Sequence, residues 1–154
     1  MAWRAWVAGA VFLVVAVLIA GAAHWYIVQR LVVDAGLTGL AGLVVTGLVT
    51  ALGCALVLQP VAERVLSPGR ILRRVSMLSY TWMGAAFYLL LLLGVSDGVA
   101  VLMGAAGLEP EWASARAPGT VAVVAVLVVL GLREVQRGPR LERVDVSLLG
   151  WPAA

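Results

Sequence analysis

The chain contains no lysine and no asparagine, and it has a single histidine and a single cysteine. A zinc site needs three or four His, Cys or carboxylate ligands close together, and a two-metal hydrolase site needs several His, Asp or Asn ligands. His24 alone cannot supply either set, and a proton relay or haem site would need a partner that the sequence does not offer. Cys54 alone excludes an intrachain disulfide and is expected to be a small packing residue. We therefore expect no catalytic, cofactor or metal site in these residues.

Long stretches of the chain also lack charge altogether. The bilayer core is ~30 Å thick and needs about 20 apolar residues per helix. Three of the uncharged blocks reach that length, and the last one reaches it if Arg133 extends toward the interface and the helix continues to Val135. The sequence thus predicts an all-α membrane protein, with a four-helix transmembrane domain over residues 1–135. The four uncharged blocks are Ala5–Ala23, Gly36–Leu58, Val75–Val95 and Ala117–Leu132.

The arginines are distributed unequally between the two predicted sides of the membrane. If the N-terminus is cytoplasmic, nine arginines lie in inner segments and only Arg30 and Arg116 lie in outer loops. Because basic loops stay inside, this predicts that both termini are cytoplasmic. The net charge of +3 is then explained by lipid headgroups, so we expect membrane lipids and no nucleic acid as partners. The inner arginines are Arg4, Arg64, Arg70, Arg73, Arg74, Arg133, Arg137, Arg140 and Arg143.

A cleavable signal peptide is an alternative reading of the first helix. Arg4, the apolar run that follows it and the small residues Ala20–Ala22 fit that pattern. The apolar stretch is long, however, and it ends in Trp25 and Tyr26, which are typical of an interfacial anchor. Cleavage would leave the topology of the other three helices unchanged.

Small residues recur at helical spacing on the second predicted helix. Such residues let helix backbones approach, and threonine hydroxyls can bond across to a neighbour or back to their own helix. The pattern predicts helix packing, with a ligand groove as the alternative, and we expect Pro60 to end this helix. The residues are Gly42, Thr46 and Thr50 on one ridge, and Gly47 and Ala51 on the next.

A basic face leads into the third predicted helix. Arg70, Arg73 and Arg74 are spaced i, i+3 and i+4, so they share one side of a helix. This face predicts contact with lipid phosphates. The alternative is a docking site for a cytoplasmic domain or for an anionic lipid substrate.

The third helix is expected to end near Gly94. Ser96 and Asp97 would then cap a short helix over Val99–Leu108, which is too short to span the membrane and is expected at its outer interface. Asp97 is thereby assigned, with Glu109 and Glu111, to an acidic second outer loop. Since no carboxylate lies inside a predicted span, an ion or proton path through the helices is not expected.

The C-terminal tail has a different pattern. Val144, Val146 and Leu148 alternate with polar residues, which is the period of a strand, and Gly150–Pro152 interrupts it. A lone strand cannot bury its apolar face. Residues 136–154 therefore read as a cytoplasmic linker and the first strand of a missing soluble domain.

Two stretches resemble the transmembrane calcineurin-like metallophosphoesterases. Residues Arg73–Gly84, followed by an apolar stretch and Asp97, are similar to the third membrane helix of that family. Gly131–Arg133 and then Leu141–Ala154 are similar to its junction, where a helix exits into a basic linker and a first strand of type Val-x-Val-x-Leu. Trp151-Pro152 stands here where Leu-Pro is usual.

In that family a bacterial membrane domain of about four helices precedes the hydrolase, so the resemblance implies location in a bacterial inner membrane. The resemblance implies a non-catalytic membrane anchor of a metal-dependent phosphoesterase that presents membrane-borne phosphate or pyrophosphate substrates. Two divalent metal ions would belong to the catalytic domain, whose ligands would all lie beyond Ala154, so no catalytic residue is carried over and this chain is not expected to be an enzyme. The alternative is a stand-alone four-helix subunit or carrier that binds a small apolar ligand between the first two helices.

Overall fold

The computed structural model describes residues 2–67, 69–108 and 115–138, and within these ranges the chain is helical with no strand. The prediction of an all-α fold is confirmed for this part of the chain. The strand-like tail and the outer-loop residues Glu109 and Glu111 lie outside the described residues. The elements are α1 (Ala2–Val28), the π-helix η1 (Gln29–Val33), α2 (Gly39–Val65), α3 (Arg70–Ala105) and α4 (Arg116–Arg137).

Within the described ranges, four helices are long and apolar enough to cross a membrane, which confirms the predicted spans. Each helix is longer than its uncharged block because polar and charged residues at the ends join it. The fourth helix continues past Arg133 and Val135 to Arg137, as expected. The candidate spans are Trp6–Val33, Gly39–Val65, Arg70–Ala105 and Arg116–Arg137.

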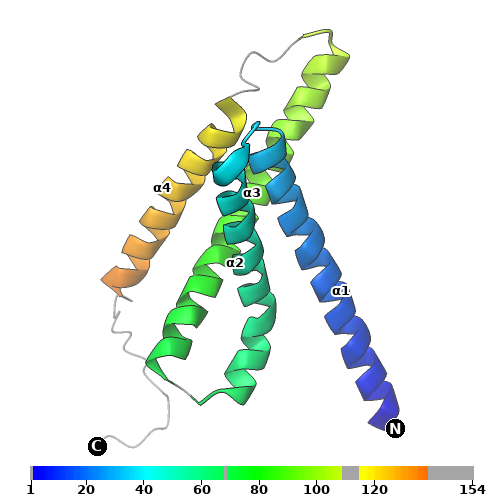
Figure 1. Cartoon of the computed structure of the whole chain (residues 1–154), viewed down its shortest axis with the longest axis vertical. Helices are drawn as coiled ribbons and strands as arrows, with labels where there is room; N and C mark the ends of the chain where they lie inside the picture. Colours follow the sequence, from blue (N-terminus) through cyan, green and yellow to red (C-terminus); the bar gives the residue numbers. More distant parts are fainter. Residues whose placement is uncertain (1, 68, 109–114, 139–154) are drawn as a thin grey trace, which may run out of the picture.

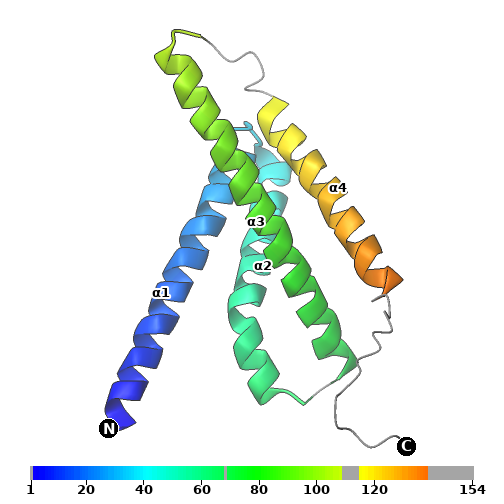
Figure 2. The ribbon, with the colours of Figure 1, turned by 180° about the vertical axis from the view of Figure 1, so that it is seen from behind.

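α3 lies between α2 and α4, whereas α1 diverges from α2 and α3 toward its own N-terminal end (Figures 1 and 2). No described side chain from Trp6 to Tyr26 is buried. The buried core lies instead where the C-terminal end of α1, η1, α2, α3 and α4 meet, and it includes Ile27, Val49, Leu93 and Val124. The bundle is therefore packed at one end and open along α1.

The expectation that Pro60 ends the second helix is wrong, because α2 contains Pro60 and continues to Val65. Proline removes one backbone hydrogen bond and strains the preceding turn. Gln59 and Glu63, on either side of it, are hydrogen-bonded to side chains of α3. These contacts hold the last turns of α2 in helical form, so tertiary structure overrides the local preference.

The predicted break after Gly94 is also wrong, because α3 continues without interruption from Arg70 to Ala105. Ser96 does not cap a new helix, since its hydroxyl donates to the Leu93 carbonyl of the same helix at 2.8 Å. The separate interfacial helix over Val99–Leu108 does not exist, and its residues up to Ala105 belong to α3.

The length of α3 explains how Asp97 can be helical and still lie at a membrane surface. Asp97 follows Arg70 by 27 residues in α3 (97 − 70), which is about 40 Å at a rise of ~1.5 Å per residue. A bilayer with its headgroups is ~40–45 Å thick. With Arg70 at one interface, Asp97 reaches the headgroup region of the other.

Candidate functional site

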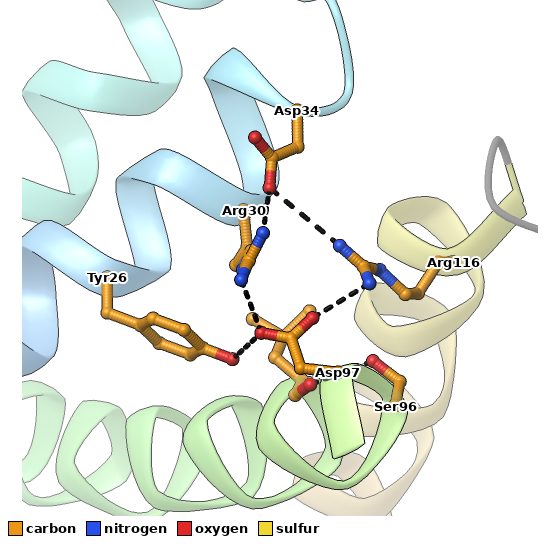
Figure 3. A network of polar contacts seen from close by, with 7 residues as sticks. Tyr26, Arg30, Asp34, Ser96, Asp97 and Arg116 are labelled. Carbon is orange, nitrogen blue, oxygen red and sulfur yellow. Dashed lines mark hydrogen bonds and ion pairs between the residues drawn. The ribbon is translucent and has the colours of Figure 1, made fainter. Parts of the chain in front are cut away.

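A network of charged and polar side chains joins α1, η1, α3 and α4 at the packed end of the bundle (Figure 3). Asp97 Oδ2 accepts a hydrogen bond of 2.6 Å from the Tyr26 hydroxyl and lies 2.7 Å from a guanidinium nitrogen of Arg30. Asp97 Oδ1 lies 2.7 Å from Arg116. Asp34 pairs with Arg30 and lies 3.7 Å from Arg116. These five residues form what we call the polar clasp.

The π-helix positions the α1 side of the polar clasp. The Asp34 amide donates to the Gln29 carbonyl at 2.9 Å, and the Leu37 amide donates to the Val32 carbonyl at 2.9 Å, five residues back in each case. π-Helical turns are rare and are frequent at functional sites. Gly36, with a φ of 65°, then provides the left-handed residue that ends the helix.

The polar clasp was not predicted from the sequence. Arg30 was assigned to the first outer loop, and Asp97 and Arg116 to the second, but no contact among the three was predicted. The available signal was their opposite charge on the same side of the membrane. With two carboxylates against two guanidinium groups the clasp carries no net charge, so its chemistry suits holding helices together rather than attracting an ion.

His24 has two hydrogen-bond partners, although none was found from the sequence. Its Nδ1 lies 2.7 Å from the Ala20 carbonyl oxygen, and the Trp82 indole N–H donates to its Nε2 at 2.9 Å. A methyl group on Gly53 would lie 2.6 Å from His24 Cδ2, so the imidazole fits only against a bare glycine. His24 thus links α1 to α2 and α3.

A second polar cluster lies near the open end, between α2 and α3. Gln59 donates to Ser76 and, at 2.8 Å, to Glu63. Ser76 and Tyr80 each donate to Glu63 at 3.2 Å. The Gln59 side chain is only 2% exposed. This cluster fixes the last turns of α2 on α3.

The three arginines of the predicted basic face do not share one environment in the structure. Arg70 and Arg73 line a hollow of about 540 Å³ together with Glu63 and Ser76. Arg74 is exposed and does not line this hollow. Contact with lipid phosphates stays a prediction for all three residues.

An apolar groove follows the gap between α1 and α2. Its upper part has a volume of about 530 Å³ and is lined by residues that include His24, Thr46, Thr50, Gly53 and Cys54. Its lower part, of about 910 Å³, extends to Trp6 and Arg64. The two parts adjoin each other, since Val17, Ala20 and Val57 line both.

The small residues of α2 take different positions. Gly42 is buried, and a methyl group there would lie 2.6 Å from the Leu37 carbonyl oxygen. Thr46 and Thr50 line the groove. Gly47 and Ala51 are exposed, and a methyl group on Gly47 would have nothing within 4 Å.

Among the residues that the structure describes, no three His, Cys, Asp or Glu side chains gather as they would around a metal ion. No protein-family model, no curated protein and no solved structure matches the chain. The resemblance to the membrane metallophosphoesterases therefore stays a prediction.

Proposed function

We propose that the chain is a membrane domain that anchors a metal-dependent phosphoesterase and has no catalytic residue of its own. The observation that carries the proposal is the direction of the helices. The start of α1, the connection between α2 and α3 and the C-terminal end of α4 point toward the same end of the molecule (Figure 1). The arginines near these ends include Arg64, Arg70, Arg74, Arg133 and Arg137.

A domain carried after α4 would leave the membrane on this basic side, which the positive-inside rule makes cytoplasmic. The polar clasp supports such a role at the opposite end, because it ties α4 to α3 and η1 through Arg116. The two divalent metal ions of the family belong to the hydrolase, and this domain contributes the membrane attachment.

Reading the gene beyond codon 154 tests the proposal directly. An open frame that soon encodes an Asp-x-His motif is expected. The full-length product should show manganese-dependent phosphoesterase activity in the membrane fraction, and deletion of residues 1–135 should move that activity to the soluble fraction. A stop codon at this point would contradict the anchor role. So would metal-dependent turnover by the purified 154-residue chain that survives repurification and is lost in His24→Ala.

The second candidate function is a stand-alone four-helix subunit or carrier that binds a small apolar ligand. The groove between α1 and α2 favours it, because its lining is largely apolar and lies where that ligand was expected. A stop codon after residue 154, together with a ligand that copurifies with the chain, would support this function over the anchor.

A further inference from the structure

We propose that the groove between α1 and α2 binds a polyprenyl phosphate, with its phosphate at Arg64 and its single chain extending toward His24. This inference deepens the proposed anchor function by naming the lipid phosphate that is held beside the hydrolase. Its biological role rests on that proposed function. Binding itself is a property of α1 and α2.

The first argument is the shape of the groove. Gly9 and Gly21 of α1 both line it, and a methyl group added to either glycine would have nothing within 4 Å. Glycine in a helix is destabilising by roughly 0.5–1 kcal/mol relative to alanine. The α1 wall thus carries no side chain at these two positions, while larger residues such as Leu13 and Val17 line the rest of it.

The second argument is the length of the groove. Its two adjoining parts together extend from Trp6 to His24, a difference of 18 residues or about 27 Å along a helix at ~1.5 Å per residue. Half of the ~30 Å hydrocarbon core is about 15 Å. The acyl chains of an ordinary diacyl phospholipid end near the midplane and would fill only about half of the groove. A polyprenyl chain that continues past the midplane fits the whole length.

The third argument is the charge at the lower end. Arg64 lines the groove there beside Pro60 and Val61. Among the described residues no carboxylate forms an ion pair with Arg64, since the neighbouring Glu63 is hydrogen-bonded to Gln59, Ser76 and Tyr80. A guanidinium group at the end of an apolar groove suits a phosphate, which it can bind through two parallel hydrogen bonds.

Native mass spectrometry of the purified 154-residue chain in detergent tests this assignment. The probe is a long-chain polyprenyl phosphate, and the comparison compounds are the matching polyprenol, a diacyl phosphatidylglycerol and inorganic phosphate. The polyprenyl phosphate should bind about tenfold more tightly than the matching polyprenol, which is the effect expected for one added charge-assisted contact. It should also bind more tightly than phosphatidylglycerol, whose acyl chains fill only about half of the groove, and than inorganic phosphate, which has no chain. Arg64→Gln should lower its affinity to that of the polyprenol.

Variants that place a larger side chain in the groove provide an independent test. Gly21→Leu and Gly9→Leu place a side chain in open space, so each should fold normally and lose polyprenyl phosphate binding. Gly131→Leu, on α4, is the matched control because it also has nothing within 4 Å and lines neither part of the groove. Arg74→Gln is the control for Arg64→Gln.

Three results would overturn the assignment. They are equal binding of polyprenyl phosphate and phosphatidylglycerol, unchanged binding in Gly21→Leu, and a dimer of the chain that Gly21→Leu dissociates, which would make a second copy the occupant. None of these results bears on the anchor function, because the hydrolase takes no part in the assay. A stop codon after residue 154 would in turn leave the binding result intact.

Discussion

The indole N–H of Trp82 donates a hydrogen bond of 2.9 Å to Nε2 of His24, and so joins α3 to α1. Because Nε2 accepts this bond, the imidazole carries its proton on Nδ1, which lies 2.7 Å from the Ala20 carbonyl oxygen. The ring is therefore held from both sides in one tautomer. The hydrogen bond between Trp82 and His24 is one of the few polar contacts that α1 makes with the rest of the described bundle.

Gly53→Ala should break this contact. Its new methyl group would lie 2.6 Å from His24 Cδ2, and the ring could move away only by leaving Trp82. Overpacking of this kind costs about 1–3 kcal/mol. Unfolding of the detergent-solubilised protein, followed by tryptophan fluorescence, should show the loss. Gly47→Ala is the control on the same helix, because nothing lies within 4 Å of its added methyl group. Equal stability of the two variants would disprove the tight fit of His24.

Asp97→Asn should loosen the polar clasp. The amide keeps the size of the side chain but removes the negative charge that faces Arg30 and Arg116, both at 2.7 Å. These side chains are partly shielded, with 19% of Asp97 and 16% of Arg116 exposed. A loss of about 1–3 kcal/mol of unfolding free energy is expected for charged partners left unpaired.

The control for the polar clasp is Glu134→Gln, which removes an ion pair with Arg137 on the surface of α4. Its two side chains are 72% and 75% exposed, and such pairs contribute about 0–1 kcal/mol. If Asp97→Asn were no more destabilising than Glu134→Gln, the clasp would not hold the helices together.

Gly42→Ala should displace the turn between η1 and α2. The added methyl group would lie 2.6 Å from the backbone oxygen of Leu37, and a backbone atom cannot rotate away as a side chain can. Because Asp34 begins this turn, we expect a loss of stability of about 1–3 kcal/mol that is not additive with Asp97→Asn, since both changes weaken one network. A double-mutant cycle measures this coupling, and strict additivity would contradict it.

The four helices could be predicted because the signal for a membrane span is local. An uncharged block of sufficient length indicates a helix whatever it packs against. The wrong predictions at Pro60 and after Gly94 arose because the end of a helix can depend on tertiary contacts. Whether a helix continues through Pro60 depends on Gln59 and Glu63 meeting α3, and contacts between distant residues leave no trace in local sequence.

The groove shows a second limit of the sequence. Small residues at i, i+4 spacing, such as Thr46 and Thr50, predict close helix packing and a ligand groove equally well. The two outcomes differ only in whether α1 packs along the whole of α2. Because the α1 sequence is uniformly apolar on the faces that could contact α2, the sequence does not distinguish them. The partner of His24 was missed for a related reason, since Trp82 lies 58 residues away.

The orientation of the domain in the membrane is the last prediction. Reporter fusions after Arg74 and after Ala154 should be cytoplasmic, and a fusion near Glu111 should be external. The physical reason is the nine-to-two division of arginines, because basic segments are retained on the cytoplasmic side during insertion.

A fusion after Val65 provides a control, since it lies on the same predicted side as the fusion after Arg74 but lacks Arg70, Arg73 and Arg74. It should give a weaker cytoplasmic signal if those residues set the orientation. A periplasmic signal from the fusion after Ala154 would reverse the topology, place Arg64 and the lower end of the groove outside, and put any attached phosphoesterase there as well.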